Sequence, residues 1–180
     1  NGVAILSKEP PEDVVRGLGD AGAEVDSQAR LVAATIGGVR VLSAYAPNGE
    51  TVGSEKWAYK LRWLERLRAY LDVRCDPERP LVLCGDLNVA PEPRDVYDPA
   101  AWEGEVLFHP EARAALERVR SWGLIDVLRR HHAEPGLYSW WDYRQLAFPK
   151  NRGLRIDHVF ASEPYARRSQ DAFIDRDARK

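Results

Sequence analysis

A short, uninterrupted apolar run constrains the fold more than any other feature of this sequence. Leu81-Val82-Leu83-Cys84 lies between Pro80 and Gly85 and contains no charged side chain. A run this short that is apolar at every position is typical of a β-strand buried on both faces of its sheet. Such a strand needs neighbouring strands and covering layers, so the run favours a layered domain.

Other segments predict four more strands around this one. The expected strands are 2–7, 31–36, 39–45 and 154–160. Gly37-Gly38 joins the middle two, and glycines supply the positive φ angles of a tight hairpin turn. Residues 9–30 are mostly polar and are punctuated by Gly and Pro, so we expect mostly loop there.

Two segments predict amphipathic helices. The first begins at Ser54, and its apolar residues recur at three- and four-residue spacing: Trp57, Leu61, Leu64, Leu67 and Leu71. The second begins at Pro110 and ends at Gly123, with an apolar stripe of Ala112, Ala115, Leu116, Val119 and Trp122. Five strands and two helices indicate an α/β (α+β) fold with mixed sheets, in one domain over 1–180.

Composition limits the classes of function. The chain has 180 residues, and its 26 basic and 28 acidic side chains nearly balance, which argues against a simple polycationic DNA binder. The two cysteines, Cys75 and Cys84, fit no metal-ligand spacing and favour a reducing cytoplasm. We see no apolar stretch long enough to span a membrane and no signal peptide, so we expect a cytoplasmic protein without a membrane partner.

The strongest local motif is Gly85-Asp86-Leu87-Asn88, directly after the apolar run. At a strand end, Asp86 and Asn88 fall on the same side of the chain because side chains alternate. The carboxylate can bind a hard cation or orient a water, and the amide can donate to a phosphate oxygen. An ordinary Asp/Asn turn after a strand explains the same pattern equally well.

Two other motifs are ambiguous in the same way. Tyr45-Ala46-Pro47-Asn48-Gly49 also ends a strand, where the phenol and the amide could donate to a phosphate; a turn beside a core tyrosine is the alternative. Asp157 lies in an otherwise apolar strand, where a buried charge needs a partner. A salt bridge to a nearby arginine would satisfy it, although Arg152 and Arg155 could equally be solvated surface charges.

A cluster of aromatic residues follows at 138–143, with basic residues downstream of it. These rings could stack on bases or line a sugar pocket. For Trp141 and Tyr143 we favour a place in the core. The histidines show no common ligand spacing, and His131-His132 is expected to end a helix.

The order of these motifs is more specific than any one of them. A strand ending in YAPNG, a helix, a strand ending in GDLN, then SWWDYR and NRGLRID resembles the exonuclease III family over nearly the whole chain. This family belongs to the larger endonuclease/exonuclease/phosphatase superfamily. GDLN alone would indicate only the superfamily, whereas the last two segments narrow the resemblance to the exonuclease III branch.

The resemblance implies roles for individual residues. Tyr45 matches a tyrosine that bonds the scissile phosphate, Asp86 an aspartate that activates water and can bind metal, and Asp157 an aspartate that orients a catalytic histidine. Asn88 matches an asparagine that holds the phosphate and that aspartate, and it is expected at the metal too. The implied substrate-binding residues are Asn48, Arg30, Trp140, Asn151, Arg152, Leu154 and Ile156, of which Trp140, Leu154 and Ile156 would form an apolar pocket for a base-free deoxyribose.

The resemblance also implies a fold, a cofactor and partners. The fold is a four-layer sandwich of two packed mixed β-sheets flanked by helices. The cofactor is Mg²⁺ or Mn²⁺, and the partners are double-stranded DNA and abasic-site DNA, acted on by a monomer. The implied activities are 3′-to-5′ exonuclease and abasic-site endonuclease activity in DNA repair.

Some features of the family are not matched. Its metal-binding glutamate would lie before Asn1 and its Ser-Asp-His segment after Lys180, so we expect an incomplete domain that is inactive by itself. Two alternatives stay open: another phosphodiesterase of the superfamily, acting on RNA, a phospholipid or an inositol phosphate, and an inactive DNA-binding fragment.

Overall fold

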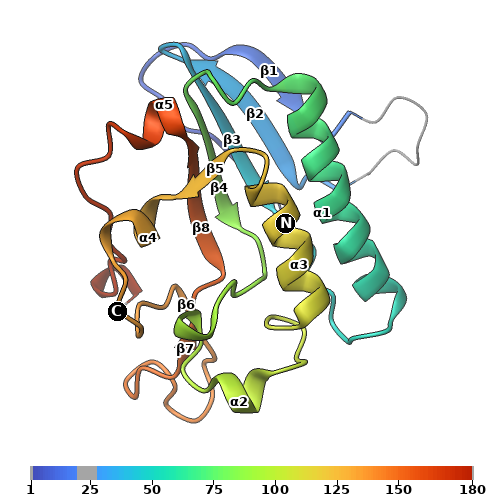
Figure 1. The fold of residues 1–180 in the computed structure, drawn as a ribbon, viewed down its shortest axis with the longest axis vertical. Coiled ribbons are helices and arrows are strands. Elements are labelled where there is room, and N and C mark those ends of the chain that lie inside the picture. Colours follow the sequence, from blue (N-terminus) through green and yellow to red (C-terminus); the bar gives the residue numbers. More distant parts are fainter. Residues whose placement is uncertain (1, 20–27, 180) are drawn as a thin grey trace.

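The computed structural model describes residues 2–19 and 28–179 and centres on one six-stranded mixed sheet (Figure 1). In sheet order the strands are β1 (Glu12–Arg16), β2 (Leu31–Ile36), β3 (Val39–Tyr45), β4 (Leu81–Asp86), β8 (Asp157–Ser162) and β5 (Leu124–Asp126). β3 and β4 run parallel, and every other neighbouring pair is antiparallel. A small second sheet pairs β6 (Trp140–Trp141) with β7 (Gly153–Leu154).

Helices α1 (Glu55–Arg74) and α3 (Pro110–Arg120) lie side by side over one face of the large sheet (Figure 1). The Ser54 hydroxyl caps α1 by accepting the amide N–H of Trp57. Leu42, Leu83 and Phe160 occupy matching positions on adjacent strands and pack into one core with the apolar stripes of both helices. Burial of these side chains, at about 2 kcal/mol each, holds the layers together.

Three short helices complete the described part of the chain: α2 (Pro99–Trp102), α4 (Val127–His131) and α5 (Glu163–Ala166). Single 3₁₀ turns lie at Pro93–Asp95 and Asp177–Arg179. Within 2–19 and 28–179, no helix is both long enough and apolar enough to cross a bilayer.

Much of the expected architecture is confirmed. The hairpin of β2 and β3, the strand β4 and the helices α1 and α3 lie where the sequence places them. Pro110 is the first residue of α3, and α4 ends at His131 as expected. The fold class is also confirmed: two β-sheets, the larger one mixed, are combined with flanking helices.

Two expectations about strands are wrong. Residues 2–7 form no strand. The segment 9–30 is mostly loop where it is described, as expected, but it also contains the strand β1, and its residues 20–27 lie outside the described residues. The strand expected at 154–160 is divided, because β7 ends at Leu154 and β8 begins only at Asp157. Between them the backbone N–H of Arg155 donates to the carbonyl of Asp95 and so leaves the ladder.

Candidate functional site

The ends of three adjacent strands bring three polar side chains together. Tyr45 ends β3 and lies opposite Asp86 at the end of β4, and Asp86 lies opposite Asp157 at the start of β8. Residues that face one another across strands share a face of the sheet. Because side chains alternate along β4, this face is the one opposite to Leu83, α1 and α3. Tyr45, Asp86 and Asp157 therefore form one row.

Gly85 allows β3 and β4 to approach closely next to this row. Its φ is +135°, and a Cβ at this position would lie 2.0 Å from the carbonyl oxygen of Ala44. Any side chain would force the two strands apart. The GDLN motif therefore needs glycine at its first position, because β3, the strand that ends in Tyr45, lies too close for a side chain.

The two candidate amides are joined directly. Asn48 Nδ2 donates to Asn88 Oδ1 at 3.0 Å, and Asn88 Nδ2 donates to the carbonyl of Ala46 at 3.0 Å. The backbone N–H of Asn88 donates to Asp86 Oδ1 at 2.9 Å, with Asn88 in a left-handed conformation. Asn88 is buried, whereas Asn48 is exposed. These hydrogen bonds connect the YAPNG and GDLN loops. The exposed amide of Asn48 can donate to a ligand, and the buried amide of Asn88 holds Asn48 in place.

Sequence reasoning missed Lys60 of α1, which lies beneath these loops. It is 0% exposed, and its ammonium donates to the carbonyls of Asn48, Asn88 and Val106 at 3.0, 2.7 and 2.8 Å. Burial lowers the pKa of Lys60 to about 7, and the charge of Asp86 opposes this shift. Spacing could have revealed it, because Lys60 falls three residues after Trp57 and four before Leu64 on the apolar stripe.

The carboxyl of Asp86 is poised to act as a base. Burial and then the charge of Asp157 raise its pKa to about 6, against hydrogen bonds from Asn88 and the charge of Lys60. A carboxyl with this pKa is ionised at pH 7 to 8 and binds a proton more strongly than an ordinary aspartate does. The mutual repulsion of the two carboxylates also favours a cation between them.

The oxygen donors of this row fit a hard divalent cation. Mg²⁺ is typically held by one or two carboxylates, with water and substrate phosphate completing its shell. Asp86 and Asp157 supply two such carboxylates, while Asn88 Oδ1 already accepts from Asn48. Over the described residues, no three His, Cys, Asp or Glu side chains gather into a closed metal cage. The arrangement fits an open site.

Arg30 lies next to this row. Its guanidinium donates to the carbonyl of Tyr45 at 3.1 Å and lies 5.1 Å from the centre of the Tyr45 ring. It also lies 5.8 Å from the ring of Tyr59. A cation over the phenol ring places positive charge beside the row, as a phosphate-binding site requires.

The residues expected to form a sugar pocket lie together, but mostly inside the protein. Leu154 and Ile156 are 0% and 2% exposed and pack with Ala90, Val96, Leu107 and Phe108. Trp140 is only partly buried and packs against this cluster from its edge. Of the three, Trp140 alone offers surface to a ligand in this conformation.

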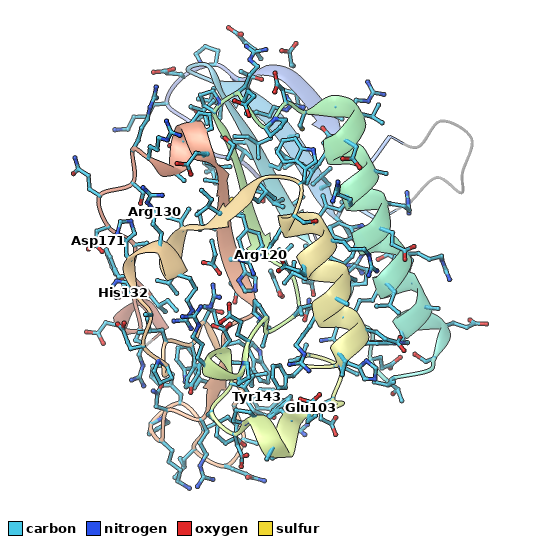
Figure 2. All side chains as sticks on the ribbon, viewed as in Figure 1. Glu103, Arg120, Arg130, His132, Tyr143 and Asp171 are labelled. Carbon is cyan, nitrogen blue, oxygen red and sulfur yellow. The ribbon has the colours of Figure 1, made fainter. Side chains whose placement is uncertain are left out.

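The segment from Trp141 to Arg152 divides into buried and exposed residues. Trp141 is buried as expected, and its indole donates to Asn151 Oδ1 at 3.2 Å. Asn151 Nδ2 donates to the carbonyl of Gly136, so its amide holds the loop. Arg152 is exposed. The core place expected for Tyr143 is wrong, because this residue is 85% exposed, in the lower part of the view in Figure 2.

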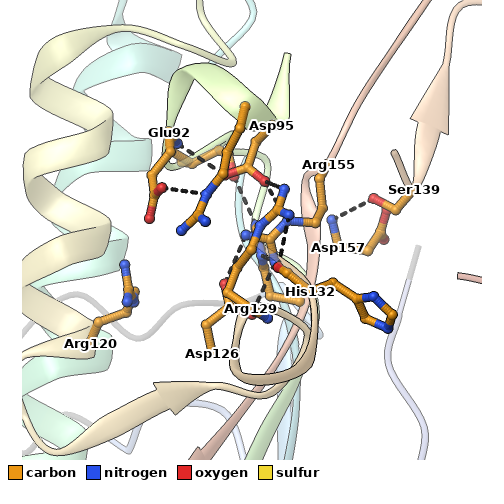
Figure 3. A network of polar contacts seen from close by, with 12 residues as sticks. Glu92, Asp95, Arg120, Asp126, Arg129, His132, Ser139, Arg155 and Asp157 are labelled. Carbon is orange, nitrogen blue, oxygen red and sulfur yellow. Dashed lines mark hydrogen bonds and ion pairs between the residues drawn. The ribbon is translucent and has the colours of Figure 1, made fainter. Parts of the chain in front are cut away.

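The expected burial of Asp157 is also wrong, and the buried charge of this segment is Arg155. Asp157 is exposed, whereas Arg155 is 1% exposed. The Arg155 guanidinium lies between Asp95 and Asp126, with shortest contacts of 2.7 Å to each carboxylate (Figure 3). Arg129 binds Asp95 as well. Arg155 is therefore no solvated surface charge, because a buried guanidinium needs such partners.

His158 belongs to the same buried network and faces away from the exposed Asp157, because successive side chains of a strand point to opposite faces. Its Nε2 lies 2.9 Å from the carbonyl of Val89, and its Nδ1 lies 3.1 Å from Arg155 Nη1. A guanidinium can only donate, so Nδ1 accepts and Nε2–H donates. Burial, and then the charge of Arg155, lower the pKa of His158 from 6.5 to about 4.

We expect this neutral histidine to make the fold sensitive to acid. Between pH 6.5 and about 4 the unfolded chain binds a proton at His158 that the folded protein rejects. The free energy of unfolding should therefore fall as the pH is lowered through this range, by roughly 3 kcal/mol from this group alone. Urea titrations at pH 7 and pH 4.5 should show a smaller fall for His158→Gln, which keeps hydrogen-bonding groups but does not titrate. An equal fall in both proteins would contradict the assignment.

Comparison with known proteins places this geometry in a family. The Endonuclease/Exonuclease/phosphatase family matches residues 1–179. The chain is 35% identical over 178 residues to an exodeoxyribonuclease of Bacillus subtilis, covering 98% of this chain and 69% of that protein. It is 34% identical over 190 residues to exodeoxyribonuclease III of Haemophilus influenzae, covering 99% of this chain and 70% of the relative.

A solved structure agrees with these relatives. An AP endonuclease from Archaeoglobus fulgidus superposes with a TM-score of 0.85 at 42% identity, over 91% of this chain and 63% of that one. The chain thus spans about two thirds of the length of the proteins that it matches. On the family match, the identities and the shared fold, the chain belongs to the exonuclease III branch of the endonuclease/exonuclease/phosphatase family.

Proposed function

We propose that the complete protein carrying this sequence is a metal-dependent DNA repair nuclease that hydrolyses phosphodiester bonds. The observation that carries the proposal is the row of Tyr45, Asp86 and Asp157, together with the linked amides of Asn48 and Asn88. It combines a base, a candidate cation site and neutral donors at the ends of three interior strands of the sheet. The names of the relatives, two exodeoxyribonucleases and an AP endonuclease, support DNA as the substrate.

Each residue has a distinct role in this proposal. The exposed amide of Asn48 and the phenol of Tyr45 donate to oxygens of the scissile phosphate, and Arg30 adds positive charge beside them. Asp86 accepts the proton of the attacking water, and its raised pKa of about 6 suits that role. Asn88 fixes both Asp86 and Asn48 through its backbone and side chain. Asp157 is the second carboxylate of the row.

A bound divalent cation would neutralise negative charge on the phosphate, and Asp86 and Asp157 would hold it. We propose Mg²⁺ or Mn²⁺, because hard oxygen donors suit these ions better than soft metals. Cleavage of duplex DNA by the complete protein should stop in excess EDTA and return when Mg²⁺ is added beyond the chelator. Zn²⁺ at the same free concentration is the control. Undiminished cleavage in EDTA would contradict a metal-dependent mechanism.

Abasic-site DNA is the proposed preferred substrate, cut by a cytoplasmic monomer. The supporting feature is the partly exposed Trp140 beside Leu154 and Ile156, an apolar edge that suits a sugar without a base. The test compares an abasic-site duplex, an undamaged duplex with a recessed 3′ end, RNA and inositol phosphates. Incision of the abasic duplex at a higher kcat/KM than the others supports the proposal. Cleavage of RNA or inositol phosphates alone would favour the other branches of the superfamily.

A further inference from the structure

Lys60 makes an unusually complete set of contacts for a buried lysine. An ammonium group has three N–H bonds, and all three are matched by backbone carbonyls at 3.0, 2.7 and 2.8 Å. The indole ring of Trp57 lies 5.5 Å from the same nitrogen. Transfer of a charge from water to the interior costs several kcal/mol unless such partners repay it. An apolar residue here would avoid that cost, so filling the core does not explain the lysine.

The three carbonyls belong to three segments that are distant in sequence. Asn48 lies between β3 and α1, Asn88 follows β4, and Val106 precedes α3. Two of these carbonyl groups come from the residues whose side-chain amides bond to each other. Lys60 therefore binds the backbone carbonyls of Asn48 and Asn88, while the side-chain amides of the same two residues bond to each other.

The packing around the lysine stem fits the same role. Gly49 follows Asn48 with a φ of +95°, and a Cβ there would lie 2.9 Å from Lys60 Cδ and 3.2 Å from the ring of Trp57. The YAPNG turn is thus pressed onto the lysine stem as well as bonded to its ammonium. The position of Asn48 depends on the side chain at residue 60 through both kinds of contact.

We propose that Lys60 is a positioning residue for the reaction: it fixes the backbones of Asn48 and Asn88 so that the Asn48 amide meets the phosphate in the correct place. The inference rests on the proposed function. Lys60 touches neither substrate nor metal and acts through the position of the Asn48 amide, which Asn88 also contacts. Misplacement of a phosphate donor by about 1 Å can cost about 100-fold in rate, so anchoring these loops has a large effect on the reaction.

The test is a double-mutant cycle in the complete protein, measured on an abasic-site duplex. Lys60→Met keeps the length of the apolar stem and removes the ammonium. We expect it to lower kcat/KM by roughly 10- to 100-fold at a temperature where unfolding curves show the variant to be folded. In an Asn48→Ala background the same change should cost less than about threefold, because the amide that Lys60 positions is gone. Lys56→Met, on an exposed lysine of the same helix, is the matched control.

A purely structural role predicts a different pattern. Lys60→Met would then lower stability but lose the same factor of activity with and without Asn48, which would overturn the inference. A second measurement does not depend on cleavage. It uses NMR to measure how fast the side-chain amide protons of Asn48 and Asn88 exchange with solvent. We expect faster exchange in Lys60→Met than in Lys56→Met, with backbone amides of β2 unchanged. Unchanged exchange rates of these side-chain amides would overturn the inference about Lys60. Failure of the wild-type protein to cut DNA would reject the proposed function instead, and the exchange measurement would still test the inference.

Discussion

Replacement of Asp86 by asparagine in the complete protein should lower kcat by about 100-fold or more and weaken DNA binding far less. The amide keeps the shape of the side chain and its contact with the Asn88 backbone but cannot accept a proton from water. The lost interaction is made mainly in the transition state, so the loss should appear in kcat rather than in binding.

Stability measurements separate this effect from unfolding. Burial and then the charge of Asp157 raise the pKa of Asp86 from 3.8 to about 6. The free energy of unfolding therefore falls as the pH rises from 3.8 through about 6, and above that range the ionised carboxylate destabilises the folded protein. Asp86→Asn should therefore unfold at the same or a higher urea concentration than the wild type at pH 8. Asp72→Asn, in an exposed ion pair with Arg68, is the control and should retain full activity. A loss in kcat of less than about tenfold at saturating substrate would show that Asp86 is not the base.

Local patterns predict much of this fold because they record which face of an element is buried. The stripe of α1, the hairpin of β2 and β3 and the apolar strand β4 all follow from spacing over short distances. Tyr45 and Asp86 of the row follow too, because YAPNG and GDLN both end predicted strands, whereas the sequence places Asp157 inside a strand over 154–160 and the structure places it at the start of β8. Local patterns do not predict β1. Its sequence is EDVVR, four of its five residues are exposed, and its register with β2 is irregular.

Contacts between distant residues explain the remaining errors. The NRGLRID segment resembles a strand with surface arginines, but Arg155 binds Asp95 and Asp126, which lie 60 and 29 residues away in sequence. No local pattern reveals that a carboxylate pair encloses this guanidinium. Lys60 differs, since its place on an apolar stripe marks it as buried, although the three carbonyls that it binds emerge only from the folded chain.

Removal of the Arg155 guanidinium should produce a large loss of stability. Arg155→Met keeps the apolar part of the side chain but leaves Asp126 without its guanidinium partner and Asp95 with Arg129 alone (Figure 3). Burial raises the pKa of the Asp95 carboxyl, but the hydrogen bonds and charges of Arg155 and then Arg129 outweigh burial and hold this pKa below its ordinary value. Breaking a buried ion pair by removing one partner costs about 3–5 kcal/mol. Urea unfolding at pH 7 should show a loss of this size.

The network also supports the site, which extends the prediction to function. Arg155 contacts His158, His158 binds the carbonyl of Val89, and Val89 follows Asn88 directly. Loss of Arg155 should therefore loosen the loop after β4 and lower kcat/KM even under conditions where the variant stays folded. Arg167→Met is the matched control, because its ion pair with Glu163 is exposed and exposed ion pairs contribute little to stability. If the two variants lost similar stability, the buried network would not be the element that fixes this part of the fold, and His158 would hold the Val89 loop without help from Arg155.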